Sequence, residues 1–158
     1  MAFLRSFFRS FIGLVFGLLA TFALTPALAA LDTGSDGTFS TIAVLVIAGG
    51  SAVLGFFAPT IRRAFGRGFL VTGVALLALP HSTMLLTGRV ASEMVTNASA
   101  EDQIFAAAGA GIAGAAMTGA ATFIGLIAGL IFVIIGLVLA LGGRREVIVV
   151  DGRGQPST

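Results

Sequence analysis

The chain of 158 residues contains no cysteine, and only 10% of its residues are charged. The absence of cysteine excludes disulfide bonds, thiolate catalysis and cysteine-ligated metal sites. Soluble domains carry about a quarter charged residues, so the low charge content argues against an ordinary soluble domain. Lysine is also absent, and the nine basic residues are all arginines. This bias suggests a GC-rich genome and therefore a bacterial source.

The chain also lacks the sequence motifs of common enzyme classes. It contains no Walker loop and no zinc-binding HExxH, and its "GAGIAG" is flanked by helix-forming alanines instead of following a strand. No Asp or Glu falls within a predicted membrane span, which disfavours a proton-coupled antiporter. The arginines lie beside apolar runs and form no separate basic face for nucleic acid. We therefore predict no enzymatic activity, no cofactor and no nucleic-acid partner.

What the chain does contain is long apolar runs. It is 57% hydrophobic, and its mean hydropathy is +1.07. Runs of about 18 or more apolar residues are typical of transmembrane helices. The sequence predicts an all-α membrane protein, a small bundle of four such helices. The predicted spans cover about residues 11–30, 41–61, 68–86 and 122–142.

The first 30 residues allow two interpretations. A basic start, a short apolar stretch, a proline and then Ala27-Leu28-Ala29 resemble a signal peptide with a small-residue cleavage site. Cleavage would leave three helices. The alternative is an uncleaved first helix in which Gly13 and Gly17 form a GxxxG packing face.

The arginines predict which side of the membrane each link occupies. Arg5 and Arg9 precede the first span, Arg62, Arg63 and Arg67 fill the link before the third, and Arg144, Arg145 and Arg153 follow the last. Placing these on the cytoplasmic side leaves only Arg89 outside. The outer side then collects Asp32, Asp36, Glu93, Glu101 and Asp102. We predict a multi-pass protein of the bacterial inner membrane whose residues 144–158 form a cytoplasmic tail.

The last apolar run, residues 104–143, has no charged residue and is about twice as long as one crossing requires. Between Ile104 and Thr122, thirteen of nineteen residues are Ala or Gly. We predict a single span at about 122–142 with a helical outer extension at about 100–121, so that residues 31–143 form one helical membrane domain. Ser99 and Asp102 resemble a capping box at its start. A re-entrant or interfacial outer half is the alternative.

Small residues recur along this helix at three- and four-residue spacing. Helices in lipid associate mainly through close packing, which small residues permit. The sequence therefore predicts a helix-packing ridge that receives a helix of the same chain, of a second copy or of a partner. The ridge comprises Gly114, Thr118, Ala121, Gly125, Gly129, Gly136 and Ala140.

Two polar features remain. His81, beside Pro80 and followed by Ser82 and Thr83, is the one ionisable residue predicted inside a span. It forms either a polar site near the outer headgroups or, in a rival hypothesis, part of a metal or haem site. Arg62, Arg63 and Arg67 form a basic loop that suits topological anchoring or binding of anionic lipid headgroups.

Together these features predict a small integral membrane protein that acts through helix–helix association. It would serve as an accessory or scaffold subunit, with the bilayer and either a membrane-protein partner or further copies of itself as its contacts. The alternative hypothesis is an oligomeric transporter or pore component whose polar path passes near His81 and includes Thr118 and Thr122.

Overall fold

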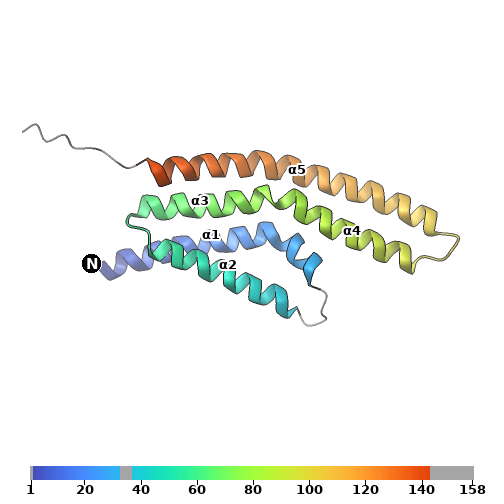
Figure 1. Cartoon of the computed structure of the whole chain (residues 1–158), viewed down its shortest axis with the longest axis horizontal. Coiled ribbons are helices and arrows are strands. Elements are labelled where there is room, and N and C mark those ends of the chain that lie inside the picture. Colours follow the sequence, from blue (N-terminus) through green and yellow to red (C-terminus); the bar gives the residue numbers. More distant parts are fainter. Residues whose placement is uncertain (1, 33–36, 143–158) are drawn as a thin grey trace, which may run out of the picture.

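The structure is a computed structural model that describes residues 2–32 and 37–142, and helices account for nearly all of them (Figure 1). They are α1 (Ala2–Leu31), α2 (Thr38–Phe56), α3 (Ile61–Leu77), α4 (Leu79–Asn97) and α5 (Gln103–Leu141). Four helical stretches are long and apolar enough to cross a membrane, since α3 and α4 together form one stretch. The predicted all-α bundle with four transmembrane spans is thus confirmed.

The helix bounds differ from the predicted spans where proline intervenes. Helix α2 ends at Phe56, five residues before the predicted end, because Pro59 disfavours helical backbone in the residue before it. The third stretch runs from Ile61 to Asn97 and is interrupted only at Ala78. Pro80 follows this interruption in the first turn of α4, where its missing N–H is tolerated best.

Two of the helical stretches are much longer than a bilayer is thick. The 37 residues of the α3–α4 stretch measure about 55 Å and the 39 of α5 about 58 Å, against a hydrocarbon core of about 30 Å. Figure 1 shows these two stretches lying antiparallel and extending together past the ends of α1 and α2. Residues 104–121 belong to the same uninterrupted helix as residues 122–141, which supports a straight extension over a re-entrant segment.

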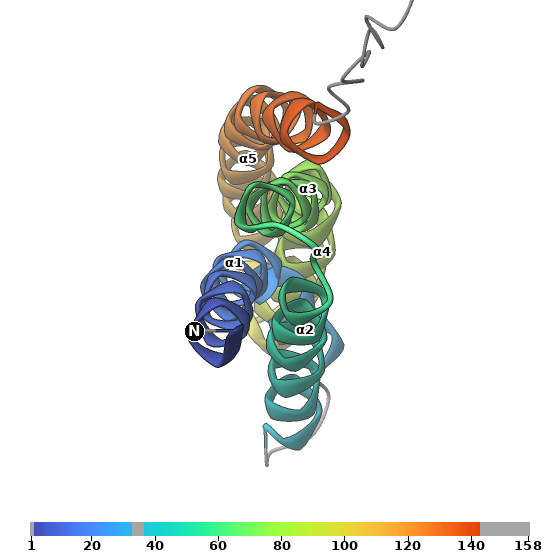
Figure 2. The same ribbon diagram turned by 90° about the vertical axis from the view of Figure 1, so that its left-hand side faces the viewer.

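The helices pack in the order α2, α1, α3–α4, α5. Helix α1 contacts α2 on one side and α3 and α4 on the other, while α5 contacts α3 and α4. Figures 1 and 2 both show α3 lying between α1 and α5. Among the described residues α1 and α5 do not touch. The central position therefore belongs to the α3–α4 stretch.

The core of this bundle consists largely of small side chains. One cluster joins Ile12, Phe16, Ala58 and Ala64, and a second joins Ala20, Ala23 and Ala75. Most large apolar side chains point outward instead, including Leu45 and Ile134. This inversion of the soluble pattern is expected where lipid surrounds the protein, because packing of small residues then holds the helices together.

The start of α5 differs in detail from the predicted capping box. The Ser99 hydroxyl donates to the Asp102 carboxylate at 2.6 Å, and Asp102 makes no side-chain capping bond. The helix begins at Gln103 after a tight turn in which the Asp102 N–H bonds to the Ser99 carbonyl. The hydroxyl is thus used to close the turn and not to cap the helix.

Candidate functional site

The predicted ridge on α5 faces α3 and α4 of the same chain. Ala121, Gly125, Gly129 and Gly136 are buried, and Gly114, Thr118 and Ala140 are half-buried on the same side of the helix. The structure therefore brings all seven predicted packing residues onto one face and fills that face internally. Of the three possible sources of a packing helix, the same chain is the one that fills the ridge, through α3 and α4.

The contacts along this ridge are close enough to require glycine. A Cβ placed on Gly136 would lie 2.8 Å from the Leu70 backbone nitrogen, and one on Gly129 would lie 3.0 Å from the Leu77 nitrogen. From the α3 side, a Cβ on Gly66 would lie 2.6 Å from the Ala140 nitrogen. Each contact is with backbone, which cannot rotate away. The helices can approach this closely only without side chains at these positions.

Gly125 has a specific role beside the interruption between α3 and α4. Pro80 has no N–H, so it cannot donate to the Leu76 carbonyl four residues earlier. A Cβ on Gly125 would lie 2.6 Å from that Leu76 oxygen and 3.1 Å from the Pro80 ring. Glycine at 125 thus lets α5 approach the carbonyl that Pro80 leaves without its helical donor, an approach that favours a weak Cα–H···O contact.

The α3 half of this interface was not predicted from the sequence. Gly66 and Gly73 on α3 are both buried, and a Cβ on Gly73 would lie 2.8 Å from the Val133 nitrogen. Gly66 and Gly73 are seven residues apart, two helical turns, so they lie on one face. The spacing of Gly66 and Gly73 is visible in the sequence. The neighbouring arginines are a stronger signal, but they indicate membrane topology and not a packing face.

A second close-packed interface joins α1 and α2. A Cβ on Gly13 would lie 2.2 Å from the Ser51 carbonyl oxygen, and one on Gly17 would lie 2.9 Å from the Ala48 Cα. From α2, a Cβ on Gly55 would lie 3.1 Å from the Gly13 Cα. Gly13 and Gly17 therefore form the GxxxG face expected for an uncleaved first helix.

Other glycines of α5 face open space. At Gly109, Gly111 and Gly119, a Cβ would have no neighbouring atom within 4 Å. Ile104, Phe105 and Ile112 on the same half of α5 are 79%, 78% and 75% exposed. This half of the helix is therefore packed on one side only.

The predicted polar site does not form one lining. His81 is exposed, whereas Ser82 and Thr83 are buried. Their hydroxyls donate to the Leu79 carbonyl, each at 2.9 Å, and so stabilise the first turn of α4. On α5 the Thr122 hydroxyl likewise donates within its own helix, to the Thr118 carbonyl at 2.7 Å. Within residues 2–32 and 37–142, no three side chains of metal-binding type gather.

Arginines at the predicted cytoplasmic end contact the carboxyl ends of neighbouring helices. Arg9 donates to the Ala58 carbonyl just after α2, and Arg67 donates to the Leu54 carbonyl in the last turn of α2 at 3.0 Å. Arg62 Nη2 lies 3.0 Å from a Cβ placed on Gly142, at the end of α5. Helix ends carry unpaired carbonyls and a partial negative charge, which a guanidinium satisfies.

The predicted basic loop is wrong, because Arg62, Arg63 and Arg67 all lie in α3, which begins at Ile61. The backbone N–H of Arg63 donates to the Thr60 hydroxyl, which caps α3 at 3.3 Å. The side chains of Arg62 and Arg67 thus have contacts within the chain, and lipid headgroup binding by Arg62, Arg63 and Arg67 stays a prediction. Arg144, Arg145, Arg153 and Asp36 lie outside the described residues, as does the side chain of Arg5.

At the other end of the bundle, Arg89 donates hydrogen bonds to the carboxyl end of α1 in the same way. Its Nη1 donates to the carbonyls of Ala29, Ala30 and Asp32 at 3.3, 3.1 and 2.9 Å, and its Nε pairs with Glu93 at 3.1 Å. The only arginine predicted outside therefore connects α4 to the carboxyl end of α1.

Searches with this chain found no matching protein-family model, no matching curated protein and no matching solved structure.

Proposed function

We propose that this protein is an accessory or scaffold subunit of the inner membrane that acts by helix association, through its outer hairpin. The outer hairpin comprises residues 87–121, from Thr87 of α4 to Ala121 of α5. The observation that carries the proposal is its one-sided packing. The hairpin extends past α1 and α2 (Figure 1), and α5 presents its exposed apolar residues there without a neighbour among residues 2–32 and 37–142.

The position of Arg89 along the helix axes supports placing this hairpin outside the bilayer. Arg89 lies at the carboxyl end of α1, where the first span ends. The rest of α4 and the paired beginning of α5 continue beyond that level. Burying a large apolar side chain is worth about 1.5–3 kcal/mol. Covering Ile104, Phe105 and Ile112 with a partner would therefore stabilise an assembly by several kcal/mol.

The partner is either a second copy of this chain or another membrane protein. The open glycines Gly109, Gly111 and Gly119 on the same helix would allow its backbone to approach closely. The internal ridge is unsuited to this role, because α3 and α4 already fill it. Substitutions at Gly125 or Gly129 would therefore report on folding, whereas substitutions at Gly111 and Gly119 report on association.

The decisive experiment combines crosslinking in native membranes with size measurement after mild detergent extraction. We expect the wild-type chain to crosslink in a defined complex and the Gly111→Leu and Gly119→Leu variants to lose it while retaining helical content. Gly49→Leu is the matched control, since Gly49 on α2 is equally open. A monomeric wild-type chain without crosslinked neighbours, or leucine variants that assemble normally, would refute the proposal.

For localisation we propose the bacterial inner membrane with the carboxyl terminus in the cytoplasm. The support is the gathering of Arg9, Arg62, Arg63 and Arg67 at one end of the bundle and of Asp32, Glu93, Glu101 and Asp102 at the other. Reporter fusions test this arrangement. A phosphatase fused after residue 158 should be inactive and a fluorescent protein there should be bright.

We propose further that α1 is retained and not removed as a signal peptide. Gly13 and Gly17 pack on α2, which otherwise contacts only α3, so cleavage would leave α2 with little support. The Ala27-Leu28-Ala29 motif lies inside α1. The intact mass of the purified protein tests this point. A mature chain beginning at Ala30 would overturn it and restore the three-helix interpretation.

The proposed role is binding and assigns no reaction to the protein. The transporter or pore alternative stays a prediction. In the single chain His81 is exposed whereas Ser82 and Thr83 are buried, so these three residues do not line one surface.

A further inference from the structure

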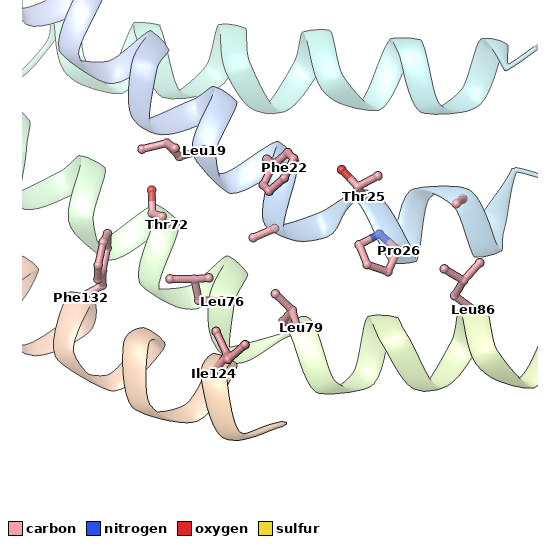
Figure 3. A pocket seen from close by; sticks show the side chains of 12 residues that line it. Leu19, Phe22, Thr25, Pro26, Thr72, Leu76, Leu79, Leu86, Ile124 and Phe132 are labelled. Carbon is pink, nitrogen blue, oxygen red and sulfur yellow. The ribbon is translucent and has the colours of Figure 1, made fainter. Parts of the chain in front are cut away.

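A groove runs between α1 and α5 where these two helices fail to meet. Its floor is the α3–α4 stretch, and its volume is about 560 Å3. Figure 3 shows side chains from all four of these helices pointing into it. Leu19 and Phe22 line it from α1, Leu76 and Leu86 from α3 and α4, and Ile124 and Phe132 from α5. Phe22 is 81% exposed at its edge, so the groove is open laterally.

The lining offers no free hydrogen-bonding group to an occupant. Its two hydroxyls are already engaged, since Thr25 donates to the Thr21 carbonyl at 3.3 Å and Thr72 to the Phe16 carbonyl at 3.1 Å. Water in such a groove would lack partners. The matching occupant is therefore a hydrocarbon, and the groove lies in the part of the bundle that we place within the bilayer.

The groove is elongated along α1, which suits an extended acyl chain. Along α1 it extends from Leu19 to Ala29, which is about 15 Å of helix. An extended acyl chain is narrow and can follow the bend where α1 passes Pro26 (Figure 3).

The outer end of the groove carries a cation. Leu86 and Ala29 lie at this end, and Arg89 follows Leu86 by about one helical turn and donates to the Ala29 carbonyl. The Nε and Nη1 atoms of Arg89 are engaged, whereas its Nη2 has no partner among the described residues. A guanidinium at this level matches the phosphate of an outer-leaflet phospholipid.

We propose that the groove between α1 and α5 is a phospholipid site that holds one acyl chain against Leu76 and Phe22, with the lipid phosphate paired to Arg89. The bound lipid then fills the space between α1 and α5 and joins the two sides of the bundle. This inference does not depend on association through the outer hairpin; it uses only Arg89, at the base of that hairpin.

Native mass spectrometry tests the site, with palmitoyl-oleoyl phosphatidylglycerol added to the detergent-purified full chain. We expect one retained lipid per chain. Thr25→Phe places an aromatic ring in the groove and should lower retention about tenfold, the effect of displacing about two buried methylene groups. Thr41→Phe is the matched control, because Thr41 is also exposed and donates four residues back, to Gly37, but lies on α2 outside the groove.

Two further variants complete the test. Ala29→Phe blocks the outer end and should act as Thr25→Phe does, which covers the case in which Thr25→Phe misfolds. Arg89→Gln should lower retention of phosphatidylglycerol several-fold more than that of an uncharged diacylglycerol with the same chains. Equal retention by the wild-type chain and both phenylalanine variants would overturn the acyl-chain site, and an equal effect of Arg89→Gln on both lipids would overturn the phosphate contact.

A photo-crosslinker at position 22 distinguishes lipid from protein occupants in native membranes. Adducts of lipid mass support the proposal. Adducts to a second copy or to another protein would replace the lipid with a protein occupant and overturn it.

Discussion

Substituting Gly13 with alanine tests the close approach of α1 and α2 with one methyl group. The new Cβ would lie 2.2 Å from the Ser51 carbonyl oxygen, 3.0 Å from its carbonyl carbon and 3.1 Å from the Ala52 Cα. Ordinary contact begins near 3.4 Å. The two helices must therefore separate by about 1.2 Å, because every one of these neighbours is backbone and cannot change rotamer.

The expected loss of stability combines two opposing effects. Overpacking a close contact costs about 1–3 kcal/mol, and separating the helices also weakens their dispersion contacts. Replacing glycine by alanine within a helix returns about 1 kcal/mol. The net expectation is a loss of about 0–2 kcal/mol in the free energy of unfolding, to which the weakened dispersion contacts add. Gly50→Ala on α2 is the control, since nothing lies within 4 Å of its Cβ position; it should be neutral or stabilising by up to about 1 kcal/mol.

Reversible unfolding in mixed micelles, followed by circular dichroism as sodium dodecyl sulfate is titrated in, measures this difference. Gly55→Ala should behave like Gly13→Ala, and the double variant should cost less than the sum of the two because both substitutions separate the same helices. If Gly13→Ala proves as stable as Gly50→Ala, α1 and α2 do not approach as described. Close packing of small residues would then not explain this interface.

Other expectations concern polar contacts between helices, and the same unfolding assay measures them. Arg89→Gln should destabilise the chain by about 1–3 kcal/mol, because hydrogen bonds from a charged donor to the end of α1 are lost; Glu93→Gln should cost under about 1 kcal/mol, since that ion pair is partly exposed. Equal effects would contradict the capping role. Thr72→Val should cost about 0.6–2 kcal/mol, because its buried hydroxyl donates across to α1, whereas Thr122→Val, which loses a bond within α5, should be nearly neutral. A larger effect at Thr122 would show that this ranking is wrong.

The long apolar runs were sufficient to predict the class of fold and the number of spans. Hydropathy is a local property, and a run of apolar residues needs no knowledge of its neighbours to favour lipid. The sequence also predicted which residues of α5 form a packing face, and the structure places Gly125, Gly129 and Gly136 together on its buried side. Helical periodicity alone determines such a face.

The partner of that face could not be predicted, because small residues permit a close approach without specifying what approaches. Tertiary structure decided that α3 and α4 fill it. It also showed that Arg9, Arg67 and Arg89 satisfy the carboxyl ends of neighbouring helices. In the sequence these arginines indicated only membrane sidedness, since the carbonyls they contact are between 13 and 60 residues away.

The groove between α1 and α5 likewise had no signal in the sequence. It exists because both helices pack on the α3–α4 stretch and are held apart by it. The sequence by itself determined which segments enter the membrane, since burial in lipid depends on each segment's own composition. Only tertiary structure decided which helices touch, because that depends on how surfaces from distant parts of the chain fit together.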